Sequence, residues 1–243
     1  MYFDEVLRAL GPSDPARIIT LQASAQIGKT ILGGVFALGS VVMGRGTTMV
    51  VHPTLETASR YSRMKLSPLM RSIPVVSSLF PNRPRDAADA ILFKERIDGL
   101  GNILISGAKS AASLSQVTAP FVLEDDLSKF EPNAGGDPEA QADSRARAHE
   151  YGKIFKLSTP LTLPDCKITK DFMAGSQERP HVPCVHCGHL HVLEWSNFHY
   201  ENPDGPYFHC PACGGLLQER HRSQMLAGLR WIAGNPGAVR MHR

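Results

Sequence analysis

The sequence predicts an α/β protein with a mostly parallel β-sheet, helices on both faces of that sheet, and a small cysteine-rich module after it. Short apolar segments alternate with helix-like segments from Arg17 to Pro160. This alternation is typical of parallel sheets covered on both faces. Beyond about residue 175 aliphatic residues become scarce and two Cys-x-x-Cys pairs appear. We therefore expect a domain at 1–175, a module at 176–220 and a truncated C-terminal tail at 221–243.

The first elements are predicted from residues 17 to 70. RIITLQA at 17–23 is β-rich, and the segment that begins Gly-Lys-Thr continues as a helix over 29–42. TTMVVH at 47–52 is a second apolar strand, which ends before Pro53. Apolar residues then recur at helical spacing over 54–70. These segments give strand, helix, strand and helix.

The middle of the chain continues the alternation after an interruption. Residues 72–89 are rich in proline, serine and arginine, which predicts a connecting loop. NILISGA at 102–108 is a strand candidate, and 110–117 is a short helix. APFVLEDD at 119–126 is an apolar strand that ends in three acids.

Two further elements complete the predicted sheet. The alanine- and charge-rich residues 137–151 begin Asp-Pro-Glu, which favours the start of a helix. KIFKLST at 153–159 is the last strand.

Bulk composition points to a soluble, cytoplasmic protein. No run of eighteen apolar residues occurs, and the N-terminus MYFDEVLRAL lacks the basic start of a secretory signal. We expect no membrane association and a location in the cytoplasm. The formal net charge is +3, so overall charge does not indicate a nucleic-acid partner. Local clusters such as Arg60, Arg63, Lys65 and Arg71 are ordinary for a solvated helix face.

The first chemical motif lies between the first strand and the first helix. In a phosphate-binding loop, backbone N–H groups at a helix N-terminus point at phosphate, a lysine neutralises the β and γ oxygens, and a hydroxyl ligates Mg²⁺. Lys29 and Thr30 fit the last two roles, although Ala23 replaces the first glycine of G-x-x-x-x-G-K-T. The predicted nucleotide-binding residues of this P-loop fold are Ser24, Ala25, Gln26, Ile27, Gly28, Lys29 and Thr30.

The acid-tipped strand supplies the second motif. Open α/β sheets bind ligands at the carboxyl ends of their strands. Asp125 is the predicted Mg²⁺ ligand, and Asp126 is predicted to orient the attacking water, a role more often held by glutamate. Glu124 is the alternative if the register is shifted by one residue. Ser158 and Thr159, at the end of the last strand, are further candidates for contact with the nucleotide.

The third motif is a metal site. Cys184-Val-His-Cys187 and Cys210-Pro-Ala-Cys213 are separated by 22 residues and are each followed by glycine. Four thiolates from two such turns complete a tetrahedral Zn²⁺ shell, which leaves no open position for catalysis. We therefore predict a structural zinc ribbon and interpret the surrounding histidines as surface groups or as groups that pack around the metal ligands.

Several segments together resemble the large terminase subunits of lambda-like tailed phages, the GpA family. They are QASAQIGKT at 22–30, VVHPT at 50–54, LEDDLSKF at 123–130, GGDPEAQADSR at 135–145, LSTP at 157–160 and VPCVHCG at 182–188.

The resemblance implies an ATP hydrolase that drives DNA packaging. Such a motor acts with a terminase small subunit, docks on the portal protein of the prohead as a homo-oligomer, and moves double-stranded DNA with ATP and Mg²⁺. It implies that Lys29 grips phosphate, that Asp125 and Asp126 handle Mg²⁺ and water, and that Ser158-Thr159 couples hydrolysis to movement. The candidates for an arginine finger are Arg60, Arg145 and Arg147.

Family members continue into a nuclease domain that works through clustered carboxylates on two metal ions. Beyond Cys213 this sequence has one acid, Glu219, and two-metal cleavage needs several. We therefore expect no nuclease activity, and a fragment, a split-gene product or a prophage remnant.

Two other functions fit the same motifs. A helicase-like DNA translocase shares the P-loop, the acid-tipped strand and the zinc ribbon, but it would be expected to carry a second motor domain. A DNA- or protein-binding remnant whose ATP site has decayed is also consistent with Ala23 and Asp126. Measured ATP turnover separates this remnant from both motors.

Overall fold

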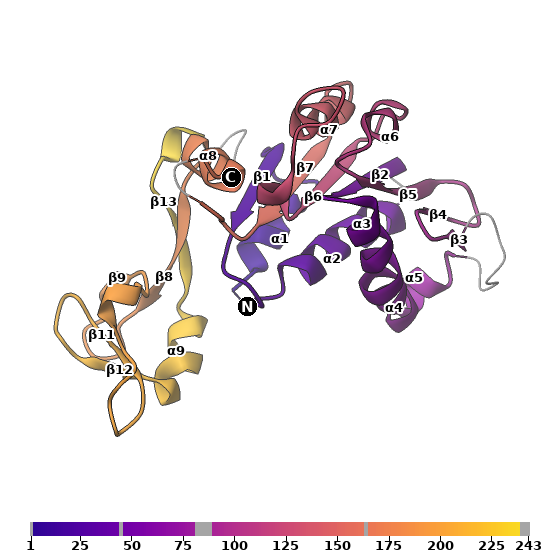
Figure 1. Ribbon diagram of the computed structural model, residues 1–243. Helices are drawn as coiled ribbons and strands as arrows, with labels where there is room; N and C mark the ends of the chain where they lie inside the picture. Colours follow the sequence, from indigo (N-terminus) through magenta and orange to yellow (C-terminus); the bar gives the residue numbers. More distant parts are fainter. Residues whose placement is uncertain (1, 44–45, 81–88, 163–164, 239–243) are drawn as a thin grey trace.

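A seven-stranded sheet forms the centre of the computed structural model, which describes residues 2–43, 46–80, 89–162 and 165–238. The strand order is β1-β7-β6-β2-β5-β4-β3 (Figure 1). The first five strands in this order run parallel, while β4 and β3 are antiparallel additions. The predicted mostly parallel α/β sheet is thus confirmed. The strands are β1 (Ile18–Gln22), β2 (Gly46–His52), β3 (Asp89–Ala90), β4 (Phe93–Glu95), β5 (Gly101–Gly107), β6 (Phe121–Asp125) and β7 (Lys153–Ser158).

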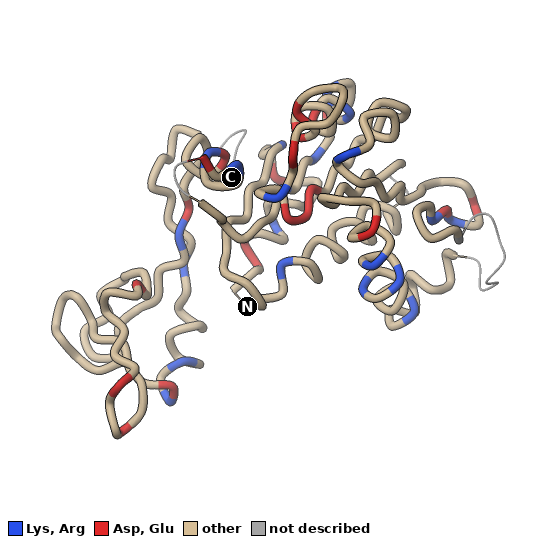
Figure 2. Tube along the Cα trace, in the orientation of Figure 1, with Lys and Arg blue, Asp and Glu red and all other residues tan. Residues whose placement is uncertain are grey.

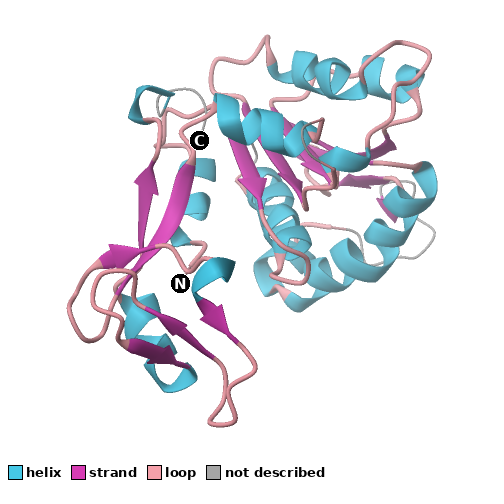
Figure 3. Cartoon of the chain, turned by 60° about the vertical axis from the view of Figure 1, so that its left-hand side comes forward, coloured by secondary structure: helices cyan, strands magenta, loops and turns pink. Residues whose placement is uncertain are grey.

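Helices cover both faces of the sheet (Figure 3). The first face packs against α1 (Asp4–Leu10), α2 (Lys29–Val42), α3 (Leu55–Tyr61), α4 (Ser67–Ser72) and α5 (Pro74–Ser77). The second face packs against α6 (Ala111–Ser115), α7 (Pro138–Ala146) and α8 (Lys167–Ala174). Each face therefore has its own apolar core, one around Phe36, Leu123 and Phe155, and the other around Met49, Val122 and Leu127.

Helix α2 lies unusually close to the sheet, and this fixes the position of its N-terminus. A Cβ atom added at Gly33 would lie 3.1 Å from both terminal carbons of Leu123 and 3.3 Å from Leu157. Glycine therefore allows the helix to approach β6 and β7 directly. Because α2 follows β1 through a short loop, its first turn meets the carboxyl ends of β1, β6 and β7.

The helix expected over 54–70 is present in three pieces. Thr54 caps α3, since its hydroxyl accepts from the backbone N–H of Thr57. A π-helical turn, Ser62–Leu66, then joins α3 to α4, and the N–H of Ser67 reaches back to the carbonyl of Ser62. Pro68 has no N–H to donate, so a regular α-helix would lose a backbone hydrogen bond at this residue. The π-helical turn lies just before it.

Other differences from the sequence prediction have local causes. The predicted loop 72–89 contains α5 and ends in β3, while residues 81–88 lie outside the described residues. The helix predicted over 137–151 ends at Ala146. Arg17 explains this early end, because its guanidinium donates to the carbonyls of Ala146 (3.3 Å) and His149 (2.7 Å).

A separate lobe contains the cysteine-rich residues (Figure 1). Two three-stranded sheets, in the orders β10-β11-β12 and β13-β8-β9, form it together with a short helix. Its elements are β8 (Glu178–Pro183), β9 (Leu190–His191), β10 (Phe198–His199), β11 (Tyr207–His209), β12 (Leu216–Gln218), α9 (Arg222–Ala227) and β13 (Arg230–Ala233). The expected tail, described up to residue 238, thus supplies α9 and β13, and β13 pairs antiparallel with β8.

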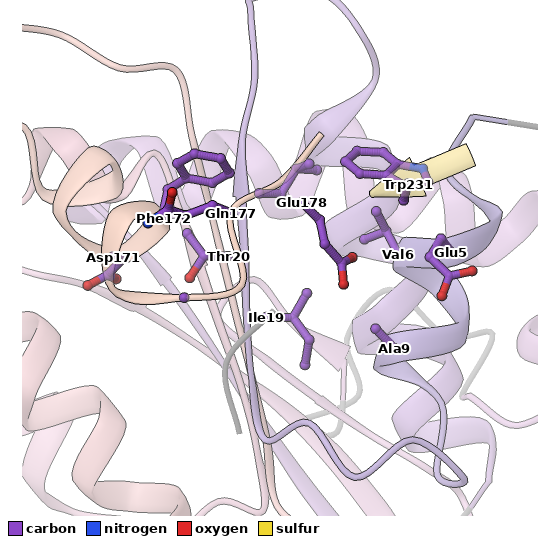
Figure 4. Close-up of a pocket in the computed structure, with 12 residues that line it drawn as sticks. Glu5, Val6, Ala9, Ile19, Thr20, Asp171, Phe172, Gln177, Glu178 and Trp231 are labelled. Atoms are coloured by element: carbon purple, nitrogen blue, oxygen red, sulfur yellow. The ribbon is translucent and has the colours of Figure 1, made fainter. Parts of the chain in front are cut away.

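The lobe contacts the sheet domain beside strand β1. Trp231 and Glu178 of the lobe lie next to Val6 and Ala9 of α1 (Figure 4). The indole N–H of Trp231 donates to the carbonyl of Tyr2 at 3.2 Å. The lobe is therefore attached by the β8–β13 ribbon and by contacts to the first residues of the chain.

Charge is unevenly distributed along the chain trace. Lysine and arginine positions gather on the helical segment from α3 to α4 (Figure 2), where Arg60 and Arg63 belong to the predicted basic face. No helix in the described ranges is both long and apolar enough to cross a lipid bilayer.

Candidate active site

The loop between β1 and α2 has the backbone of a phosphate cradle. Gln26 and Gly28 adopt positive φ angles of 64° and 95°, which turn the chain sharply before the first turn of α2. Ala23 is not among the described residues with positive φ, so its backbone does not require the glycine expected there. Its N–H donates to the carbonyl of Ser158 at 3.2 Å, which ties the loop to the end of β7.

Lys29 folds across this loop. Its ammonium group donates to the carbonyl of Ser24 at 2.5 Å and to the hydroxyl of Thr159 at 3.0 Å. Burial lowers the pKa of Lys29, and the nearby carboxylates of Asp126 and Asp125 oppose that shift. The ammonium therefore bridges the loop and the Ser158-Thr159 segment, two of the elements predicted to meet around a nucleotide.

Asp125 lies opposite the first turn of α2. The hydroxyl of Thr30 lies near its carboxyl group and lowers the pKa of that group. Burial, followed by repulsion from Asp126, raises the pKa of Asp125 to about 7, against the effects of Thr30 and Lys29. A carboxylate beside a threonine hydroxyl is a hard-oxygen pair of the type that Mg²⁺ prefers.

Asp126 occupies the strained position after the strand. Its φ angle of 61° is left-handed, which turns its side chain away from the strand direction. The carboxylate is partly exposed and accepts from the ammonium of Lys129 at 2.7 Å. Asp126 therefore stays at the carboxyl end of β6, where a ligand can reach it.

Glu124 lies on the other face of the sheet. Successive side chains alternate across a strand, so Glu124 points toward α7 and α8 while Asp125 points toward α2. Glu124 is fully buried and its two carboxyl oxygens have no hydrogen-bond partner among the described residues. Burial and the neighbouring acids raise its pKa well above the ordinary value, while Lys156 opposes this. The structure does not bring Glu124 together with the phosphate loop.

Lys156 is the centre of an ion-pair network on that second face. Its ammonium lies 2.6 Å from Glu139 and 3.0 Å from Asp143, both on α7, and 3.1 Å from Asp171 on α8. The Lys156 side chain is 4% exposed. This network joins β7 to two helices and has no contact with the phosphate loop.

The Ser158-Thr159 segment links the phosphate loop to the turn after Asp126. The Ser158 hydroxyl accepts from the N–H of Ser128 at 3.2 Å and donates to the carbonyl of Thr159 at 3.0 Å. Thr159 in turn accepts from Lys29. A movement of the Lys29 side chain can thus displace the turn after Asp126, because Thr159 and Ser158 connect the two by hydrogen bonds.

The three arginine candidates lie apart from this site. Arg60 is exposed on α3 and pairs with Glu56 at 2.6 Å. The carbonyl of Arg145 accepts from Ala119 just before β6 begins, which places Arg145 at the opposite end of the strands, with Arg147 beside it. None of the three contacts the loop.

Sequence reasoning missed one buried group at the site. His52 is the last residue of β2, and its Nδ1 lies 3.9 Å from Oδ2 of Asp125. Burial lowers the pKa of His52 to about 4, so the ring is neutral at pH 7. A histidine at the carboxyl end of an apolar strand was the available indication, but its closeness to Asp125 depends on β2 pairing with β6.

The four predicted zinc ligands converge in the lobe. The sulfur atoms of Cys184, Cys187, Cys210 and Cys213 all lie within 4.8 Å of one another. Both Cys-x-x-Cys turns have the same backbone, because the N–H groups of Gly188 and Gly214 donate to the carbonyls of the first cysteines at 2.8 and 2.9 Å. Cys166, the fifth cysteine, is buried against Ser128, in the other domain.

A strand, a lysine-bearing loop at a helix N-terminus and a neighbouring acid-tipped strand define the class of P-loop nucleoside triphosphatases. Residues 2–231 match the family described as "Phage terminase large subunit gpA, ATPase domain". The chain belongs to this family, and it is an ATP-hydrolysing enzyme of that kind.

Individual relatives agree with the family match. The chain is 26% identical to the terminase large subunit of Enterobacteria phage P21 over 96% of its own length and 37% of that protein. It is 26% identical to the terminase large subunit of Escherichia phage lambda over 79% of its own length and 30% of that protein. It therefore spans about a third of these relatives.

Among solved structures, the large terminase ATPase domain of Thermus phage P74-26 is similar to this chain. The identity is 17%, the TM-score is 0.48, and the likeness covers 67% of this chain and 66% of that chain.

Proposed function

We propose that this chain is the ATPase motor part of a phage terminase that packages double-stranded DNA into the prohead. The observation that carries the proposal is the loop between β1 and α2, which holds Lys29 and Thr30 against Asp125 within a family match over residues 2–231. The same match favours a terminase over the helicase-like translocase that shares these motifs. The terminase small subunit and the portal protein are the proposed partners, with a homo-oligomer forming on the portal in the host cytoplasm.

The proposed roles follow from placement. The N–H groups of residues 24–30 surround the phosphates, and Lys29 exchanges its bonds to Ser24 and Thr159 for phosphate oxygens. Thr30 and Asp125 hold Mg²⁺, which supplies charge neutralisation at the phosphates when bound. Asp126, at the exposed strand end, orients water. We assign this role to Asp126 because Glu124 lies on the opposite face of the sheet.

ATP turnover by the purified protein, with and without double-stranded DNA, tests the motor. We expect Lys29→Ala to lower turnover at least about 100-fold, because it removes a preorganised positive charge. Stimulation by double-stranded DNA is expected for a packaging motor. Folded wild-type protein whose turnover equals that of the variant would exclude an active motor and favour the binding remnant.

We also propose that the four-cysteine cluster holds a structural Zn²⁺ in a zinc ribbon. Two sulfur pairs, Cys184 with Cys213 and Cys187 with Cys210, are each separated by 3.8 Å. A tetrahedral site with Zn–S bonds of about 2.3 Å has S–S edges of about 3.8 Å. The donor set and its spacing thus fit the ion, and the closed shell implies a structural role.

Metal analysis tests the zinc site. Wild-type protein purified without added metal should carry about one zinc per chain, and Cys213→Ser should lose most of it. Cys166→Ser is the matched control, since Cys166 lies outside the cluster. Equal zinc content in all three proteins would place the metal elsewhere.

A further inference from the structure

His52 is held rigidly beside the proposed Mg²⁺ ligand. It ends β2, which is flanked by β5 and β6, and its own carbonyl accepts from Ala108 at 2.7 Å. Its ring packs on the ring of Tyr61, with 4.4 Å between centroids and 43° between planes. The backbone and the aromatic contact together leave the imidazole little freedom to rotate.

Two polar atoms of this pair are buried. Nε2 of His52 and the hydroxyl of Tyr61 have no hydrogen-bond partner among the described residues. The 3.9 Å between Nδ1 and Asp125 is also too long for a hydrogen bond. Buried polar groups are normally satisfied, and exceptions require an explanation such as an unseen water or ion.

The pair lies beside the proposed Mg²⁺ site. Nδ1 of His52 is 3.9 Å from Oδ2 of Asp125, and a Cβ added at Gly34, one helical turn beyond Thr30, would lie 3.5 Å from the Tyr61 hydroxyl. A cavity of about 310 Å³ between α2 and α4 borders Thr30 and Tyr61. Mg²⁺ usually keeps several water ligands, and those waters need hydrogen-bond partners in the protein.

We propose that His52 is a positioning residue of the Mg²⁺ site: clamped by Tyr61, it hydrogen-bonds a water ligand of the Mg²⁺ that Thr30 and Asp125 hold. This inference rests on the proposed function, since it assumes that nucleotide and Mg²⁺ bind at the P-loop. An imidazole suits the role, because its ring nitrogens can hydrogen-bond water. Residues that hydrogen-bond the ligands of a metal commonly affect its affinity, in addition to the residues that bind it directly.

Mn²⁺ binding to the ADP complex, measured by electron paramagnetic resonance, tests the role without turnover. His52→Phe keeps the ring contact with Tyr61 but removes both nitrogens. We expect it to weaken Mn²⁺ binding about 10-fold, while ADP binding in EDTA changes less than about twofold. His52→Gln, whose amide can still bond water, should lose less.

The controls separate this inference from the proposed function. His149→Phe alters another histidine with an unpartnered Nε2, but at the opposite end of the strands, and should leave Mn²⁺ binding unchanged.

Wild-type protein that binds no ADP would overturn the proposed function and this inference together. Wild-type ADP and Mn²⁺ binding with unchanged Mn²⁺ affinity in folded His52→Phe would overturn the inference alone. If His52→Phe does not fold, unchanged Mn²⁺ affinity in both His52→Gln and Tyr61→Phe would overturn it.

Discussion

Glu124 and Asp125 are neighbours in one strand, yet the two faces of the sheet give them different surroundings. Asp125 faces a loop, a threonine hydroxyl and a histidine whose Nε2 has no hydrogen-bond partner among the described residues. Glu124 faces Lys156, whose charge is already shared by three other carboxylates. On the first face, polar groups remain that can bind a ligand. On the second face, the cation Lys156 is engaged in ion pairs that connect β7 to two helices. Burial of an acid therefore does not by itself mark a catalytic group.

The largest expected effect is on the second face. Lys156→Met should destabilise the fold by about 3–5 kcal/mol, because it leaves buried carboxylates without their cation. Denaturant unfolding measures the loss. Lys170→Met is the matched control, since its ion pair with Asp165 is exposed, and it should cost less than about 1 kcal/mol. Equal losses would mean that the network does not stabilise the fold.

On the first face, Asp125→Asn should lower ATP turnover at least about 100-fold, because an amide holds Mg²⁺ poorly and does not replace the lost charge. Steady-state hydrolysis at saturating Mg²⁺ measures this. Near-normal turnover would show that Asp125 is not a Mg²⁺ ligand, and the proposed difference in role between Asp125 and Glu124 would be wrong.

The same substitution should affect stability in a pH-dependent way. The pKa of Asp125 is raised to about 7 in the folded protein, so between about pH 4 and pH 7 the folded state keeps a proton that the unfolded state has lost. This difference lowers wild-type stability as the pH rises through that window. Without Mg²⁺ and nucleotide, Asp125→Asn should therefore gain stability relative to wild type from pH 4 to pH 7.

Thermal unfolding at several pH values in EDTA checks this expectation. His52 has a lowered pKa and therefore an effect of opposite sign, but it is present in both proteins, so the difference between them isolates Asp125. A stability difference that is constant across the window would show that Asp125 ionises normally.

The smallest effect is expected for Glu124→Gln. The raised pKa of Glu124 favours its protonated form, which glutamine resembles in shape and charge. Turnover should stay within about threefold of wild type, and stability within about 1 kcal/mol. A loss of turnover as large as that of Asp125→Asn would show that Glu124 takes part in ATP hydrolysis.

Much of the sheet domain was predictable because its signals are local. The helix at 29–42 was predicted with its observed bounds, since Gly28 and the apolar run after it define its start and length. The strands at 47–52 and 153–159 differ from β2 and β7 by a single residue. Each of these segments carries its own periodicity or turn residues.

What escaped prediction depends on distant partners. Strand β13 exists because β8 lies beside it, and α7 ends early because Arg17 binds the carbonyl of its last residue, Ala146, and that of His149 beyond it. The closeness of His52 to Asp125 requires the pairing of β2 with β6. The opposite directions of Glu124 and Asp125 were available from strand alternation alone, and only the network around Lys156 needed the structure.

The pairing of β8 with β13 has a consequence for how such proteins can change over evolutionary time. The chain enters and leaves the cysteine-rich lobe along two adjacent antiparallel strands. Residues gained or lost in the long segment between Cys187 and Cys210 enlarge or shrink the lobe, while the ends of the ribbon stay at a fixed separation. The lobe can therefore diversify in length without any compensating change in the sheet domain.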